Sequence, residues 1–239
     1  MIENAVPNRH LLHDQYVRQS QWFYGLRSQL LRKVNARAKR HILDLGCGTG
    51  VITKELSERC TGDITAVDMD AEVFKAFPEH FGKAKPVVAS GEALPFDDAS
   101  FDLVFTQMFF LWVKDPECVL REVHRVLQCG CELIISAEPD YGGCIGFPTE
   151  ANPGPALAEA LQRVGADPFI ARRLPEALAA AGFEVATGVH PSLFRPSELS
   201  DRWNEELDFI RSLGGRPPKT EQPPSFLFTP YFWFLARKM

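Results

Sequence analysis

Residues 46–50, Gly-Cys-Gly-Thr-Gly, place three glycines at alternate positions directly after an apolar run. Because glycine has no Cβ, such a loop can turn tightly and let a ligand approach the backbone closely. Residues 41–45 predict a short buried strand that carries Asp44, and residues 51–57 have helical spacing. A strand, a glycine loop and a helix N-terminus in that order form a ligand-binding device.

The spacing of the glycines narrows the choice of ligand. A phosphate-binding P-loop carries Lys-Ser or Lys-Thr after its glycines, and no such pair follows here. A dinucleotide fingerprint needs glycine at its sixth position, where this chain has Val51. A second strand, residues 64–68, ends in Asp68, whose carboxylate can accept hydrogen bonds from both hydroxyls of a ribose. The pattern indicates a nucleoside with an uncharged or zwitterionic tail.

Strand and helix patterns alternate along the rest of the chain, which implies crossover connections and a parallel sheet. Further strands are predicted at 86–90, 101–105, 132–136, 184–189 and 226–236. Helices are predicted at 10–36, 71–77, 116–127, 155–164, 169–181 and 198–213.

Composition limits the class of protein. The chain has 239 residues, 45% of them hydrophobic, and a net charge of −5, which argues against a nucleic-acid partner. No apolar run is long enough to span a bilayer and the N-terminus has no apolar signal region, so we expect a cytoplasmic protein without a membrane partner. The six cysteines are then expected to be reduced, and Cys129-Gly130-Cys131 predicts a tight turn before a strand. No metal site is expected.

Several segments together resemble the class I S-adenosylmethionine-dependent methyltransferases. They are ILDLGCGTG, ITAVD, EALPFDDASFDLV and the helix VLREVHRVL, in the expected order between about residues 40 and 138. The resemblance implies an α/β, Rossmann-like, doubly wound sheet of seven mostly parallel strands with an antiparallel last strand, a helical N-terminal cap and inserted lid helices. One domain over 1–239 is expected, with a cap (1–37), a cofactor-binding half (38–138) and an acceptor-side half with insertions (139–239).

The family roles carry over to individual positions. The three glycines would line the methionine tail and ribose of S-adenosylmethionine, with Asp44 holding the loop or the cofactor's ammonium through water. Asp68 would take the ribose diol and Met69 would pack on adenine. The predicted cofactor-binding set is Asp44, Gly46, Cys47, Gly48, Gly50, Asp68, Met69, Ser90, Gly91, Glu92, Thr106 and Gln107, the last two near the sulfonium.

The chain departs from the family at one adenine contact. Ser90-Gly91 stands where relatives often have Asp-Ala, so a weaker bond from Ser90, a substitution by Glu92 or the Gly91 amide is expected there. No metal ion is expected beside the cofactor.

The acceptor pocket should lie beyond the carboxyl ends of the parallel strands. Its candidate residues are Tyr16, Trp22, Phe109, Glu138, Asp140, Tyr141 and Trp203. The 109–112 segment is expected to form one wall, although Phe109 and Trp112 can equally be core. The acids at 138 and 140 can either hold a cationic substrate or cap the next helix. No catalytic residue is assigned, and His13 and Tyr16 are the candidates for proton transfer.

These observations favour a methyltransferase that acts by direct displacement on a small-molecule acceptor, as a monomer or homodimer. Methyl transfer from a sulfonium mainly requires alignment and exclusion of water, so no catalytic triad is needed. Three alternatives stay open: a non-catalytic subunit or sensor that binds S-adenosylmethionine or S-adenosylhomocysteine, an RNA or protein methyltransferase, and an aminopropyl transferase or oxidoreductase that uses another nucleoside.

Overall fold

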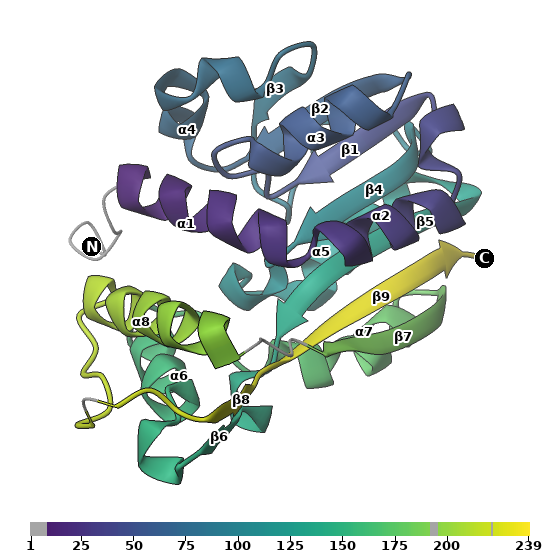
Figure 1. Ribbon diagram of the computed structural model, residues 1–239. Helices are drawn as coiled ribbons and strands as arrows, with labels where there is room; N and C mark the ends of the chain where they lie inside the picture. Colours follow the sequence, from purple (N-terminus) through teal and green to yellow (C-terminus); the bar gives the residue numbers. More distant parts are fainter. Residues whose placement is uncertain (1–8, 192–195, 221) are drawn as a thin grey trace.

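A seven-stranded sheet forms the centre of the computed structural model, which describes residues 9–191, 196–220 and 222–239 (Figure 1). The strand order is β3-β2-β1-β4-β5-β9-β7. β9 is antiparallel to both of its neighbours, while β1 to β5 pair in parallel, as predicted. The strands are β1 (His41–Leu45), β2 (Asp63–Asp68), β3 (Lys85–Val88), β4 (Phe101–Gln107), β5 (Leu127–Pro139), β7 (Phe183–Pro191) and β9 (Pro230–Lys238).

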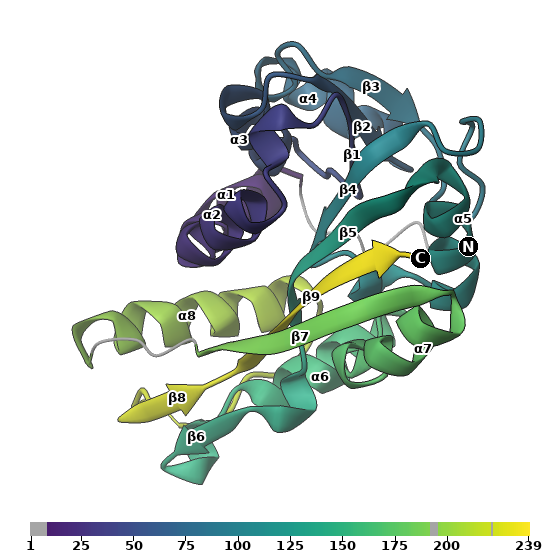
Figure 2. The same cartoon turned by 90° about the vertical axis from the view of Figure 1, so that its right-hand side faces the viewer.

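Helices cover both faces of this sheet, which explains the unbroken apolar runs of its central strands. α2 (Tyr24–Lys33) and α3 (Val51–Arg59) contribute to one buried cluster, and α5 (Pro116–Val126) and α7 (Leu174–Ala180) contribute to another. Figure 2 shows the two pairs on opposite sides of the strands. Successive residues of β1 point to opposite faces, so Ile42 packs in the first cluster and Leu43 in the second.

The strand order reverses between β1 and β4, which are neighbours in the sheet although β2 and β3 separate them in sequence. In open α/β sheets, ligands bind at such a switch point, outside the carboxyl ends of the strands. α1 (Arg9–Trp22) and α8 (Pro196–Ser212) flank this end of the sheet in Figure 1. The other helices are α4 (Ala71–Ala76) and α6 (Gly154–Arg163), with 3₁₀ turns at Ala36–Ala38, Pro78–His80, Phe110–Trp112, Tyr141–Gly143, Thr149–Ala151 and Ile170–Arg172.

The single helix predicted over 10–36 is two helices, α1 and α2, which are separated at Phe23. Phe23 is 1% exposed, and its ring lies 4.7 Å from that of Tyr231 on β9. We attribute the break to this docking, because the tertiary contact of one large side chain can override helical periodicity.

Three further predicted elements differ from the structure. Residues 169–181 form a 3₁₀ turn and the short helix α7, whose first turn contains Pro175. The last predicted strand is divided at Thr229 into β8 (Phe226–Phe228) and β9, and β8 pairs with the unpredicted β6 (Ile145–Phe147) in a separate two-stranded sheet. Cys129-Gly130-Cys131 is an irregular part of β5, with Gly130 at φ +76°, and not a turn before the strand. No helix among the described residues is long and apolar enough to cross a membrane.

Candidate functional site

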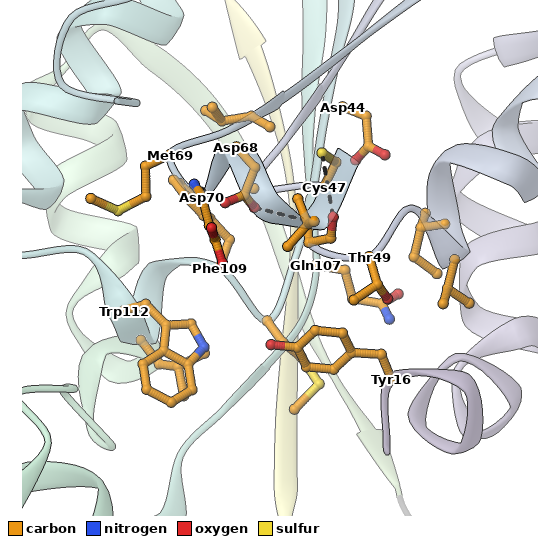
Figure 3. Close-up of a pocket in the computed structure, with 18 of the residues that line it drawn as sticks. Tyr16, Asp44, Cys47, Thr49, Asp68, Met69, Asp70, Gln107, Phe109 and Trp112 are labelled. Atoms are coloured by element: carbon orange, nitrogen blue, oxygen red, sulfur yellow. Dashed lines mark hydrogen bonds between the residues drawn. The ribbon is translucent and has the colours of Figure 1, made fainter. Parts of the chain in front are cut away.

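A cavity of about 660 Å³ lies at the carboxyl ends of β1, β2 and β4. α1, α8 and the segment after β4 supply its other walls (Figure 3). Eleven of the residues predicted from the sequence line it: Asp44, Gly46, Cys47, Gly48, Asp68, Met69, Gly91, Gln107, Tyr16, Phe109 and Tyr141. Segments far apart in sequence therefore meet at one site.

The glycine loop brings bare backbone to the cavity wall. Gly46 has φ +73°, and a Cβ added there would lie 2.2 Å from Cδ2 of Phe109. Gly48 has φ +50°, and its added Cβ would lie 3.2 Å from Cε2 of Tyr16. Backbone N–H groups of Gly46 and Cys47 both donate to the carbonyl of Val67 on β2, which fixes the loop to the neighbouring strand. The loop therefore fits between two aromatic rings only because it has no side chains at these positions.

Asp68 ends β2 and joins it to the loop. Its Oδ2 accepts the Gly48 N–H at 2.8 Å and its Oδ1 accepts the Asp70 N–H at 2.9 Å. Burial raises the pKa of this carboxyl above its usual range, while the two backbone N–H groups oppose the rise. A carboxylate has about four acceptor positions, so after these two bonds Asp68 can still accept from a diol.

Asp44 lies below the loop and is 3% exposed. Its Oδ2 accepts the Thr53 hydroxyl on α3 at 2.6 Å. Burial raises the pKa of Asp44 to about 7, and the bond from Thr53 limits this rise. Asp44 therefore connects β1 to α3 across the glycine loop.

A buried arginine sets the orientation of Gln107 at the end of β4. Arg27, 1% exposed on α2, donates to Oε1 of Gln107 at 3.1 Å and also pairs with Glu55 on α3. Because arginine only donates, the amide oxygen of Gln107 faces Arg27 and its NH₂ group points away.

The cap helix α1 meets the loop through two side chains. The Tyr16 ring lies in the cavity, and its phenol has a pKa raised to about 12 by burial and by the nearby Asp68 and Asp70. His13 lies outside the lining, where its Nδ1 is 2.9 Å from Oγ1 of Thr49 and its ring stacks on Phe77. Tyr16 thus stays protonated near neutral pH and can donate a hydrogen bond.

Residues 43–135, which contain the glycine loop, Asp68 and Gln107, match the family model of the methyltransferase domain. The match identifies this segment as a methyltransferase domain. It covers the first five strands of the main sheet, from within β1 to within β5.

Curated relatives resemble this methyltransferase domain over part of their length. Over 96 residues the chain is 36% identical to malonyl-[acyl-carrier protein] O-methyltransferase 1 of Coxiella burnetii, a match that covers 40% of the chain and 32% of the relative. It is 31% identical over 115 residues to a ubiquinone/menaquinone biosynthesis C-methyltransferase of Pseudoalteromonas translucida, covering 45% and 46%. These matches span less than half of each relative.

Solved structures with the methyltransferase fold extend the likeness to most of the chain. An S-adenosylmethionine-dependent methyltransferase from Methanosarcina mazei has a TM-score of 0.59 and 20% identity, covering 88% of this chain and 97% of that one. A [4+2]-cyclase has a TM-score of 0.60 and 19% identity, covering 89% and 79%. At such identities the likeness shows the fold alone, and the cyclase illustrates that this fold hosts other reactions.

Four residues of the predicted cofactor set lie outside the cavity lining of the methyltransferase domain: Gly50, Ser90, Glu92 and Thr106. Gly50 precedes α3, with Phe81 and His80 against it. Ser90 and Glu92 are exposed, and the Ser90 hydroxyl accepts the Glu92 N–H at 3.2 Å. Of the three adenine candidates, only Gly91 faces the cavity.

Four predicted acceptor residues also lie outside the lining and make contacts within the fold. The Trp22 ring packs against the guanidinium of Arg202, and Trp203 donates its Nε1–H to the Ala151 carbonyl at 2.8 Å. Asp140 caps the Tyr141–Gly143 turn and pairs with Arg172, so the helix-capping alternative describes it.

Glu138 is the fourth of these residues and is 0% exposed. Its Oε1 accepts the N–H groups of Phe109 and Phe110, at 2.6 and 3.0 Å. Burial raises the pKa of Glu138 to about 7, against the effect of these bonds. This carboxyl therefore holds the backbone of the cavity wall at Phe109.

Other lining residues were not in the predicted set. They include Gln15, Gln19, Thr49, Asp70, Met108, Val164, Phe209 and Leu213, whereas Leu111 and Trp112 belong to the 109–112 segment that was expected to form a wall. Asp70 and Thr49 adjoin predicted residues, so proximity in sequence was a usable signal. Phe209 lies in the last turn of α8 and Leu213 directly follows the helix, and helical periodicity does not show which turn meets the site. Among the described residues, no group of three or more His, Cys, Asp or Glu side chains is arranged to hold a metal ion.

Proposed function

We propose that the chain is an S-adenosylmethionine-dependent methyltransferase that acts on a small-molecule acceptor by direct displacement. The observation that carries this proposal is the junction of Asp68 with the glycine loop on one wall of the 660 Å³ cavity. Its size lies within the range of about 300–1,000 Å³ for pockets that bind small molecules. The two curated relatives described above are named as methyltransferases, which supports the same reaction class.

The residues present fit this cofactor. Asp68 can accept from the ribose hydroxyls, and Gly46 and Gly48 let the methionine portion approach the backbone. Met69, which is 78% exposed, and Gly91 both line the cavity and would contact adenine. The cofactor would supply an activated methyl group bound to a sulfonium.

The chain's own contribution is then alignment and exclusion of water. Phe109 and Trp112 form an aromatic wall of the cavity. Tyr16 can orient an acceptor by donating its hydroxyl hydrogen, because its raised pKa keeps the phenol protonated near neutral pH and so unable to accept a proton as a general base. The reaction therefore suits an acceptor that is nucleophilic without early loss of a proton.

Calorimetric titration with S-adenosylmethionine and S-adenosylhomocysteine tests cofactor binding, with NAD as the control ligand. We expect micromolar affinity for both sulfur nucleosides, none for NAD, and loss of binding in Asp68→Ala. Asp97→Ala, at an exposed carboxyl outside the cavity, is the matched control and should bind normally. If folded protein bound neither sulfur nucleoside, the proposal would fail.

A second assay separates an enzyme from a sensor or cyclase. Protein that binds the cofactor is incubated with radiolabelled S-adenosylmethionine, labelled in the methyl group, and with pools of small molecules, RNA or unrelated proteins. Label transferred to a small molecule is the expected result. Label found only in RNA or protein would replace the proposed acceptor class, and binding without any transfer would favour a sensor.

A further inference from the structure

The cavity has two ends with different chemistry. The charged residues that line it, among those the structure describes, are Asp44, Asp68 and Asp70, which adjoin the glycine loop and the end of β2. In Figure 3, Trp112 lies across the cavity from Asp44 and Asp68. The acidic end is the end that fits the nucleoside.

The opposite end is built from apolar and aromatic side chains. Its lining residues are Leu111, Trp112, Tyr141, Val164, Phe209 and Leu213. They come from the turn after β4, the turn after β5, and the C-terminal ends of α6 and α8. No carboxylate of the described chain lines this end.

Within the described part of the chain, no lysine, arginine or histidine lines the cavity at either end. Three arginines pair with carboxylates outside the lining: Arg27 with Glu55, Arg172 with Asp140 and Arg202 with Glu206. A negatively charged acceptor that entered would lose hydration without gaining a cationic partner, which is unfavourable.

A positively charged acceptor is disfavoured for a chemical reason as well. A protonated amine has no lone pair with which to attack a methyl carbon, so it would have to lose its proton first. The cavity lining also holds neutral polar groups: the Tyr16 hydroxyl donates, and the amide of Gln107 turns its NH₂ away from Arg27. These groups match an uncharged oxygen or nitrogen on the acceptor.

We infer that the acceptor is an uncharged, largely apolar small molecule, and that the site discriminates against carboxylate and phosphate acceptors. The inference rests on the proposed function, since it assigns the cofactor to the acidic end. It follows from the lining of the apolar end together with the absence of a cation from the described lining.

Binding of three probes of nearly equal shape tests the inference: naphthalene-2-carboxamide, naphthalene-2-carboxylate and 2-naphthylmethylammonium. Each is titrated into protein saturated with S-adenosylhomocysteine at pH 7.5. We expect the carboxamide to bind at least about tenfold more tightly than either ion, a difference of about 1.4 kcal/mol in binding free energy. Equal or tighter binding of the carboxylate or the ammonium would overturn the inference.

A variant that adds a cation to the apolar end should shift the preference toward the carboxylate, which tests the inference from the opposite direction. Val164→Arg places a guanidinium at the rim of the apolar end, where the half-buried side chain leaves room for it to reach solvent. It should strengthen carboxylate binding by at least about threefold and weaken carboxamide binding. Gln162→Arg, exposed and outside the lining, adds the same charge and should leave both affinities unchanged.

The outcomes separate this inference from the proposed function. Failure of S-adenosylhomocysteine to bind would refute the cofactor assignment, whatever the probes do. Normal binding of S-adenosylhomocysteine with preference for the carboxylate would refute only the acceptor class. Circular dichroism and thermal melting of each variant confirm that changes in affinity belong to folded protein.

Discussion

Replacement of Glu138 by glutamine should stabilise the protein increasingly as pH rises. The carboxyl is fully buried, its Oε1 accepts two backbone N–H groups, and its Oε2 has no hydrogen-bond partner among the described residues. Glutamine keeps an acceptor oxygen for Phe109 and Phe110 and cannot ionise. Glu138→Gln therefore removes the cost of burying a charge while it retains the bonds that hold the cavity wall.

The size and sign of the effect follow from the pKa of Glu138, which is raised from 4.5 to about 7 in the folded protein. Between these values the native state holds a proton that the unfolded state has released, so the free energy of unfolding of the wild type falls as pH rises. Each pH unit is worth about 1.4 kcal/mol, which gives about 3 kcal/mol over the window. Above pH 7 the difference between variant and wild type should stay constant.

Urea unfolding followed by tryptophan fluorescence at pH 4.5, 5.5, 6.5 and 7.5 measures this difference. The free energy of unfolding of Glu138→Gln minus that of the wild type should increase through the series. Glu184→Gln, at an exposed carboxyl on β7, is the matched control and should show a much smaller change. A difference for Glu138→Gln that does not vary with pH would refute the assignment of a buried, protonated carboxyl.

Three other substitutions test separate parts of the site. Gly46→Ala should weaken S-adenosylhomocysteine binding at least about tenfold in calorimetry, because the added Cβ would displace the Phe109 ring. Gly165→Ala is the control, since this glycine has φ +85° and an added Cβ would meet no atom within 4 Å. This control should lose about 1–2 kcal/mol of stability through backbone strain and bind S-adenosylhomocysteine normally. Asp44→Asn should raise the melting temperature at pH 8 more than at pH 4. Burial raises the pKa of Asp44 from 3.8 to about 7, so the stability of the wild type falls as pH rises between these two values. An equal shift of the melting temperature at both pH values would contradict the raised pKa. Trp203→Phe should lower the free energy of unfolding by about 1–3 kcal/mol through loss of the hydrogen bond to the Ala151 carbonyl, without changing the affinity for S-adenosylhomocysteine. A large loss of affinity would instead indicate that Trp203 belongs to the binding site.

The nucleoside end of the site was predictable because its residues lie in two short segments, at the ends of β1 and β2, and their backbone determines their role. The glycines at 46 and 48 have positive φ, and Asp68 ends a strand whose parallel pairing to β1 places it beside the loop. The positions of the glycines and the apolar pattern of the strands can both be recognised in the sequence. The seven mostly parallel strands and the antiparallel last strand came from the resemblance, and both are confirmed by the structure.

The acceptor end was less predictable because tertiary packing assembles it. The sequence indicated that α8 would contribute Trp203, whereas the structure brings Phe209 and Leu213 to the cavity and buries Trp203 against Ala151. One helix presents different faces along its length to the core and to the site. Which turn reaches the cavity depends on how α8 docks, and no local signal encodes that.

Two backbone positions show how the fold shapes the cavity wall without a recognisable motif. Met108 and Ala137 have φ +51° and +56°, a conformation that costs non-glycine residues about 1–2 kcal/mol. Both lie where β4 and β5 reach the carboxyl edge, and the Met108 N–H donates to the Ser136 carbonyl. The turn at Met108 directs the chain into Phe109, whose N–H then meets Glu138. The strained backbone of Met108 and the buried carboxyl of Glu138 thus act together on the same wall of the cavity. Glu138 therefore influences the shape of the cavity although it does not line it.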